Sequence, residues 1–337
     1  MVMSEGLRHY ARQLGFPQSD NLARIFEILL EAEDDRRIFE ALPGTVSDLG
    51  ERTGIPPRRI SEICEKLFNR GAISKPIDRP DQYRRFPAMI EIRDATALWP
   101  EAPQEIFVLW DRLMTDETPA LVPVFKKGKL PPMMRVVPIE RTVKAQNTVL
   151  DVDSARKIFR DAELISVMPC VCRLIARKNG RGKECPAPNT SVCMQTNRFA
   201  EGVLMRGVGE SITNEEALRR IASAEDAGLV HTVRNNVKND MIMCNCCACC
   251  CTGLYFVHKL KYPQGLAPSR FRAFINENAC SGCGLCADRC QFHAITLEDV
   301  ATIDDNSCYG CGNCVLSCPD EAIKLVEVRP VEHIRIT

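Results

Sequence analysis

The sequence has little that would direct the protein to a charged partner or a membrane. Lys plus Arg equals Asp plus Glu, so net charge points to no class of partner. No run approaches the ~18 apolar residues that a membrane span needs, and MVMSEGLRHYARQLGFPQ lacks the apolar core of a secretory signal. There is no GxxxxGK[ST] motif, and Gly207-Val208-Gly209 lacks the third glycine of a dinucleotide fingerprint. These absences argue against a membrane-spanning helix and against a nucleotide-driven enzyme within this chain.

Cysteine is nearly missing from the first half of the chain and abundant in the second. Residues 1–169 contain only Cys64, whereas 18 of the 19 cysteines lie between Cys170 and Cys318. Thiols at this density, without an export signal, are more typical of metal binding than of disulfides. We therefore expect a cytoplasmic protein in a reducing environment, as in an anaerobe or facultative anaerobe.

The cysteine distribution and the hydrophobic patterns together predict a multidomain α+β protein. We expect four segments: a helical, winged-helix-like domain at 1–125, a Pro-rich linker at 126–140, a cysteine-rich α+β middle domain at 141–273, and a dicluster ferredoxin domain at 274–327. The middle domain contains ten cysteines and the last domain eight.

The N-terminal segment contains a pattern similar to a winged helix-turn-helix. TVSDLGERTGIPPRRISEICEKLFNRGAISKP predicts a short helix, a turn and a longer helix, and DQYRRFPAMIEI predicts a following strand. The longer helix has one apolar face, made by Ile60, Ile63, Cys64, Leu67 and Phe68. Cys64 is therefore expected in the core. Between residues 36 and 86 there are 11 Lys/Arg against 7 Asp/Glu, with Arg58 and Arg59 opening the longer helix. This small excess favours protein docking over DNA binding.

Two copies of a specific metal motif lie near the C-terminus. CSGCGLCADRC and CYGCGNCVLSCP both read C-x2-C-x2-C-x3-C, a spacing in which the fourth cysteine ligates the other cluster. The first 4Fe–4S cluster is thus expected on Cys280, Cys283, Cys286 and Cys318. The second is expected on Cys308, Cys311, Cys314 and Cys290. Two swapped copies argue against zinc. The segment resembles bacterial-type ferredoxins with two such clusters, except that Gln291 replaces the usual proline.

The middle domain has two groups of cysteines whose partition the sequence leaves open. The first group is Cys170, Cys172, Cys185 and Cys193; the second, in CNCCACCC, is Cys244, Cys246, Cys247, Cys249, Cys250 and Cys251. Neighbouring residues of an extended segment face opposite ways, so CNCCACCC can present thiolates in two directions. We expect one or two further Fe–S clusters, either two cubanes with two spare thiols or one less usual cluster. Within the run, Cys244, Cys246, Cys247 and Cys250 are ranked ahead of the other two.

Several alternatives for the middle domain remain open at this stage. Zinc bound by the first group fits its spacing as well as iron does, whereas disulfides within CNCCACCC would be strained. The helix predicted within SITNEEALRRIASAEDAGLVH returns the chain so that the two groups can meet. His231 is interpreted as an ordinary strand residue, with cluster ligand and proton donor as alternatives. Arg173 either hydrogen-bonds toward a cluster or is a solvated surface residue.

The order of these motifs resembles a family of cytoplasmic 4Fe–4S ferredoxin-like proteins of anaerobic bacteria and archaea. The shared features are the winged-helix-like start, CVCR with two later cysteines, EEAL…AEDAGLVH, CNCC-x-CC and the dicluster ferredoxin. The resemblance covers residues 35 to 326. It implies electron transfer, with Fe–S clusters on the middle cysteines as well, and it implies no substrate.

We interpret the chain as an iron–sulfur electron carrier, a subunit or partner of a larger anaerobic oxidoreductase rather than a stand-alone enzyme. No catalytic residue is indicated. Two alternatives are a redox-responsive Fe–S transcription regulator that uses the winged helix, and a small reductase with an open cluster in the middle domain. The ferredoxin segment, with eight Asp/Glu against two Lys/Arg between residues 274 and 326, would suit docking to a basic redox partner.

Overall fold

The chain folds into two compact units, each made of three stretches of sequence. The computed structural model describes residues 3–128, 131–143, 154–236 and 241–334. The first unit contains residues 1–124, 171–181 and 202–208, and the second contains 125–170, 182–201 and 209–337. The mixture of helices and small sheets confirms the predicted multidomain α+β class, while the predicted domain boundaries stay a prediction.

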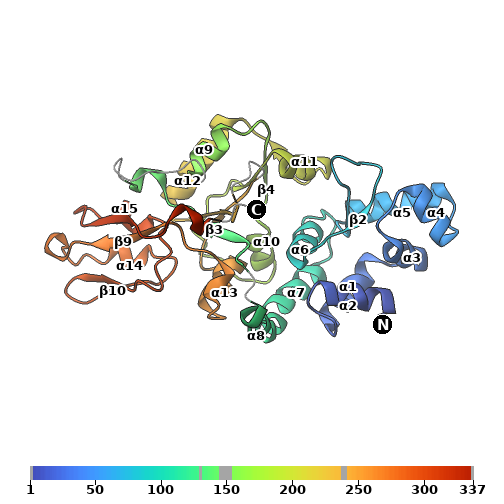
Figure 1. Ribbon diagram of the computed structural model, residues 1–337, viewed down its shortest axis with the longest axis horizontal. Coiled ribbons are helices and arrows are strands. Elements are labelled where there is room, and N and C mark those ends of the chain that lie inside the picture. The colour runs from blue at the N-terminus through green and yellow to red at the C-terminus, as the bar shows by residue number, and fades with distance from the viewer. Residues whose placement is uncertain (1–2, 129–130, 144–153, 237–240, 335–337) are drawn as a thin grey trace. The chain divides into compact units, whose positions relative to one another are not determined.

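The first unit is almost entirely helical (Figure 1). Its main helices are α1 (Glu5–Gln13), α2 (Asp20–Leu29), α3 (Glu33–Ala41), α4 (Val46–Thr53), α5 (Pro57–Asn69), α6 (Met89–Ala97), α7 (Gln104–Arg112) and α10 (Val171–Lys178). Helix α8 (Thr118–Gly128) follows α7 after a π-helical turn and continues into the second unit. Side-chain oxygens of Ser4, Ser19 and Thr45 accept from backbone N–H groups and so begin α1, α2 and α4.

Aromatic packing forms the centre of the first unit. The rings of Tyr10, Phe26 and Phe39 contact one another with centroids 5.4–6.1 Å apart. The predicted apolar face of α5 is buried, and Cys64 on it is 0% exposed. Burial raises the pKa of the Cys64 thiol to about 12. The prediction that Cys64 is a core residue is confirmed.

The predicted strand in DQYRRFPAMIEI is much shorter than expected. Only β2 (Arg84–Arg85) is extended, and it pairs antiparallel with β1 (Ile73–Ser74). Pro87 has no N–H to continue the ladder, and the chain turns into α6 at Met89. A two-residue ladder therefore follows α5 in place of a full strand.

The second unit is built around an antiparallel sheet of six strands. Their order is β3-β7-β8-β5-β4-β6, with bounds β3 (Met134–Val136), β4 (Ile165–Met168), β5 (Cys193–Thr196), β6 (Glu210–Ser211), β7 (Val230–Arg234) and β8 (Ile242–Cys246). Strand β3 lies in the stretch that the sequence predicts as a linker, because Arg135 and Val136 are buried against β7. Lys129 and Leu130 of that stretch lie outside the described residues.

Helices α9 (Ala155–Arg160) and α12 (Asn214–Asp226) lie side by side in this unit (Figure 1). As expected, Thr213 caps α12, and Gly228 adopts a positive φ of 72° just beyond its end. The chain then returns through β7 to β8. Met241 and Met243 are buried in the core between sheet and helices, which confirms their packing role. The remaining helices here are α11 (Asn197–Met205), whose end belongs to the first unit, and α13 (Thr252–His258).

The C-terminal part of the second unit has two matching halves. Its elements are β9 (Phe271–Ile275), α14 (Leu285–Asp288), β10 (Ile295–Leu297), β11 (Ala301–Ile303), α15 (Asn313–Ser317) and β12 (Ile323–Glu327). Strand β9 pairs with β12, and β10 with β11. Each cysteine motif has a glycine with positive φ at the same place, Gly282 and Gly310. A Cβ there would stand 2.5 Å from Asp299 O and 2.0 Å from Phe271 O.

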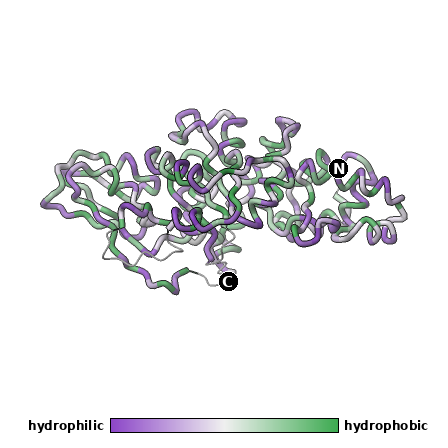
Figure 2. The backbone as a smooth tube through the Cα atoms, turned by 90° about the horizontal axis from the view of Figure 1, so that it is seen from above, coloured by the Kyte–Doolittle hydropathy of each residue, from purple (hydrophilic) through white to green (hydrophobic). Residues whose placement is uncertain are grey.

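Hydrophobic and hydrophilic stretches are interspersed along the described backbone (Figure 2). Among the described residues, no helix combines the length and hydrophobicity that a membrane crossing requires.

Candidate metal centres

The thiols of CNCCACCC are divided between a strand and a turn. Strand β8 ends at Cys246, and its pleat places Cys244 and Cys246 on one face and Asn245 on the other. The chain then turns, and the N–H of Cys251 donates to the Cys247 carbonyl at 3.1 Å. The expected presentation of thiols in two directions follows from this change of backbone at Cys246.

Four thiols of the second unit meet in one group. The Sγ atoms of Cys185, Cys247, Cys249 and Cys250 all lie within 4.8 Å of one another. The Sγ atom of Cys247 is 3.4 Å from that of Cys185 and 3.1 Å from that of Cys249, and Cys249 and Cys250 are 3.6 Å apart. We call these residues the four-thiol group. The group includes Cys249, which the sequence ranks behind Cys244 and Cys246.

A second set of thiols lies at the start of β5 and the end of β8. Hydrogen bonds of the Cys244 thiol with the sulfurs of Cys193 and Cys246, together with burial, raise the pKa of Cys244 well above its usual value. Strand pairing explains the proximity, because Met194 is opposite Met243 and so places Cys193 beside Cys244. Cys185 and Cys193, which the sequence assigns to one group, therefore belong to different sets.

The CVCR segment is divided between the units. Cys170 ends a stretch of the second unit, and Cys172 lies on α10 in the first. Within the first unit, Arg93 of α6 is buried and its Nη2 donates to Cys172 Sγ at 3.2 Å. Arg173 is buried as well, so its interpretation as a solvated surface residue is wrong. Sequence reasoning did not find Arg93, because 79 residues separate it from Cys172.

The C-terminal motifs bring the second predicted ligand set around one cavity. Cys290, Cys308, Cys311 and Cys314 line it, together with apolar side chains such as Phe292 and Ile295. Cys290 comes from the first motif and the other three from the second. Burial raises the pKa values of Cys290, Cys311 and Cys314, that of Cys311 to about 12.

Thiols from both motifs lie near Cys286 of the first predicted set. Burial raises the pKa of Cys286, and the nearby thiols of Cys280 and Cys318 add to this effect. Cys318 comes from the second motif. Cys283, also of this set, is exposed.

Thiols gathered in this way fit a bound metal cofactor. Burial disfavours the thiolates of Cys244, Cys286, Cys290, Cys311 and Cys314, whose pKa values are raised. A metal cation reverses that preference, and a coordinating thiol is deprotonated outright. The apolar lining around the cavity of Cys290, Cys308, Cys311 and Cys314 limits solvent access, which tunes the potential of a cluster.

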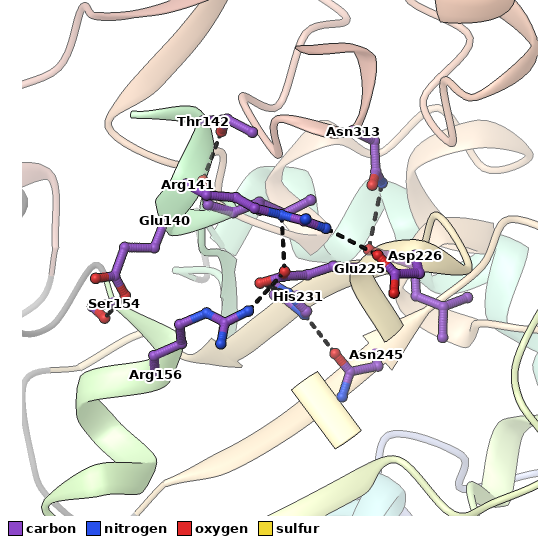
Figure 3. A network of polar contacts seen from close by, with 12 residues as sticks. Glu140, Arg141, Thr142, Ser154, Arg156, Glu225, Asp226, His231, Asn245 and Asn313 are labelled. Carbon is purple, nitrogen blue, oxygen red and sulfur yellow. Dashed lines mark hydrogen bonds and ion pairs between the residues drawn. The ribbon is translucent and has the colours of Figure 1, made fainter. Parts of the chain in front are cut away.

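A buried polar network supports β8 from the face opposite its cysteines (Figure 3). His231 Nδ1 donates to Asn245 Oδ1 at 2.5 Å, and Asn245 Nδ2 donates to the Val192 carbonyl. His231 Nε2 is 3.6 Å from a carboxylate oxygen of Glu225, and both side chains are 1% exposed. The strand position of His231 agrees with its interpretation. Its acidic partner Glu225 was missed, because the pair joins the last turn of α12 to β7.

Arginines complete this network at Glu225. Arg156 Nη2 lies 2.8 Å from Glu225 Oε2, and Arg141 Nε lies 3.2 Å from it. Burial opposes ionisation of Glu225, but His231 and Arg156 outweigh it and hold its pKa below the usual value. Glu225 is thus a buried carboxylate that pairs with α9 and β7.

The side chains of Gln291, Arg289 and Asn313 join the C-terminal motifs to the rest of the second unit. The Ala248 N–H, between Cys247 and Cys249, donates to Gln291 Oε1 at 2.8 Å. Arg289 donates to the carbonyls of Glu225 and Asp226 at 2.7 and 2.9 Å. Asn313 donates to the Gly228 carbonyl at 3.0 Å (Figure 3). Residues next to predicted ligands therefore contact the end of α12 and the turn after β8.

Comparison with known protein families identifies the C-terminal region. The family described as 4Fe-4S dicluster domain matches residues 279–322, which include all eight cysteines of the two motifs. No curated protein and no solved structure matches the chain. The match confirms a ferredoxin-type dicluster domain with 4Fe–4S clusters as its cofactors, and it says nothing of residues before 279.

Proposed function

We propose that the protein transfers single electrons through the two 4Fe–4S clusters of its C-terminal domain. The observation that carries this proposal is the match of residues 279–322 to the 4Fe-4S dicluster domain. Bound clusters of this type supply one-electron chemistry at low potential. The role of the chain is to hold them, to exclude water with residues such as Phe292 and Ile295, and to set their potentials.

We assign one ligand from the opposite motif to each cluster. Cys280, Cys283, Cys286 and Cys318 hold the first, and Cys308, Cys311, Cys314 and Cys290 hold the second. The cavity lined by all four members of the second set supports this assignment, as does the influence of Cys318 on Cys286. A further Fe–S cluster is proposed at Cys193, Cys244 and Cys246, with Cys170, which belongs to the same unit, as its remaining ligand.

The partner that we propose is a redox protein or the larger oxidoreductase of an anaerobe, as the family resemblance implies. The dicluster segment carries eight acidic against two basic residues. Such a surface favours a partner with a basic docking face and makes association sensitive to salt.

Iron and acid-labile sulfide analysis of anaerobically purified protein tests the proposal. We expect at least about eight iron atoms per chain, the content of two cubanes, and reversible reduction by one electron for each cluster. A content clearly below this value contradicts the proposal. Cys311→Ser should lose one cluster, whereas Cys64→Ser, at a core thiol, should keep the full content.

A second candidate function is DNA binding by a redox-responsive regulator. It is suggested by α4, α5 and the short β1–β2 ladder that follows them. This arrangement suits a winged helix, and the side chain of Arg58 at the start of α5 is 94% exposed. Arg58 and Arg59 also face Glu62, at 3.3 and 3.6 Å, which weakens their attraction for phosphates. The test is to measure binding to genomic DNA fragments at several salt concentrations, with the protein in its oxidised and its reduced state. Absence of salt-sensitive binding in both states leaves α5 as a protein-docking element.

A further inference from the structure

The Sγ atoms of the four-thiol group lie too close together to bind a 4Fe–4S cubane. In a cubane, each thiolate binds a different iron, so neighbouring Sγ atoms stand roughly 6 Å apart. Around one tetrahedral ion with metal–sulfur bonds of about 2.3 Å, they stand ~3.8 Å apart. The measured separations of 3.1, 3.4 and 3.6 Å, all within a limit of 4.8 Å, match the single ion.

The dicluster domain provides an internal comparison. Its eight cysteines all lie in described residues, and none of them belongs to a group of three or more ligand atoms as close as 4.8 Å. Nevertheless, Cys290, Cys308, Cys311 and Cys314 share one cavity. The Sγ atoms of the dicluster cysteines thus stand farther apart than those of the four-thiol group. We propose that Cys185, Cys247, Cys249 and Cys250 bind one metal ion, of the zinc class, as a structural tetrathiolate site.

The backbone around the group forms a tight turn, and its cysteine spacing occurs in zinc sites. Cys247 and Cys250 have C-x2-C spacing, which is common in structural zinc sites. The N–H groups of Cys250 and Cys251 both donate to the Cys247 carbonyl, at 3.4 and 3.1 Å, and so close a tight turn. The fourth ligand, Cys185, arrives from a different part of the chain.

The surroundings indicate what such an ion does. Between α10 and β5, residues 179–192 contain no helix or strand. The buried cluster beside the group consists of small and medium side chains: Ala187, Val192, Ala224, Leu229 and Cys247. So small a core contributes little burial energy, and an ion that joins Cys185 to the turn after β8 fixes this irregular segment. Zinc has no redox chemistry, so the site is a structural crosslink outside the electron path.

Metal analysis of the intact, iron-replete protein, purified anaerobically, tests the inference. We expect about one zinc per chain in addition to the cluster iron and sulfide. Cys185→Ser and Cys249→Ser should each lose that ion and keep all sulfide, whereas Cys64→Ser, at a buried thiol outside the group, keeps it. One iron without matching sulfide, lost in the same two variants, also supports a single-ion site. Loss of about four iron and four sulfide in Cys185→Ser overturns it.

Two further measurements test the proposed zinc site. The first uses only wild-type protein and so does not depend on how well a variant folds. X-ray absorption at the zinc edge of the wild-type protein should show four sulfurs at about 2.3 Å and no iron neighbour. The absence of stoichiometric zinc and of sulfide-free iron from the wild type overturns the inference. Trypsin should also cut Cys185→Ser faster than wild type after Arg181 or Lys183. Failure of the inference leaves the eight iron atoms of the proposed electron carrier unaffected.

Discussion

Gln291 is the residue through which the dicluster domain holds the turn after β8, and its replacement tests that contact. Its Oε1 accepts from the Ala248 N–H at 2.8 Å, between two members of the four-thiol group. The corresponding residue of the second motif, Pro319, has no side-chain acceptor. Gln291→Leu removes the acceptor and retains the size of the side chain.

The expected effect follows from the loss of one hydrogen bond. A hydrogen bond of this kind contributes about 0.5–1.5 kcal/mol net, so Ala248 should exchange its amide hydrogen roughly 2- to 10-fold faster. The contact of His258 Nε2 with the Gln291 carbonyl involves the main chain and remains. We therefore expect a local change at the turn, without general destabilisation.

Hydrogen exchange read by mass spectrometry, with fragmentation that resolves single amides, measures this effect. Gln291→Glu is the matched control, because its carboxylate retains an acceptor and should keep Ala248 protected. Gln291→Pro should behave like the Leu variant. Unchanged exchange at Ala248 in Gln291→Leu would refute the idea that the dicluster domain holds the turn through this side chain.

Three further predictions concern the supporting structure. Glu225→Gln should destabilise the protein by about 2 kcal/mol, below the usual range for a buried pair because its arginine partners are partly exposed. Since the folded-state pKa of Glu225 is lowered, the difference in melting temperature from wild type should be constant above about pH 5 and shrink below the unfolded pKa of ~4.3. Gly310→Ala, whose Cβ meets a backbone oxygen at 2.0 Å, should lower the melting temperature far more than Gly54→Ala, which meets nothing within 4 Å. Arg93→Met removes a buried donor to Cys172 Sγ within the first unit and should lower the melting temperature relative to wild type, as measured by calorimetry.

Local sequence signals predict much of this structure. The repeated cysteine spacing identifies the dicluster domain, because its ligands lie within two short runs. The capping residue Thr213 and the glycine after α12 predict that helix, because caps act on neighbouring backbone groups. The burial of Cys64 follows from the period of its helix.

What the sequence does not reveal depends on contacts between distant segments. Cys185 joins Cys247 across 62 residues, and Arg93 reaches Cys172 across 79. No spacing rule relates such residues. The partition of the ten middle cysteines likewise depends on the register of β5 with β8, which places Cys193 beside Cys244. Register is fixed by the packing of the whole sheet rather than by either strand alone.

The contacts at the end of α12 bear on how the dicluster domain is handled in the laboratory. The last carbonyls of a helix have no partner within the helix, and here Arg289 supplies donors to two of them while Asn313 reaches the carbonyl just beyond. A truncation before β9 would remove these donors along with the clusters. The dicluster domain is therefore not structurally independent of the rest of the second unit. Its transplantation would leave behind a frayed helix, so activities of the remaining chain are best compared using cysteine variants in the intact protein.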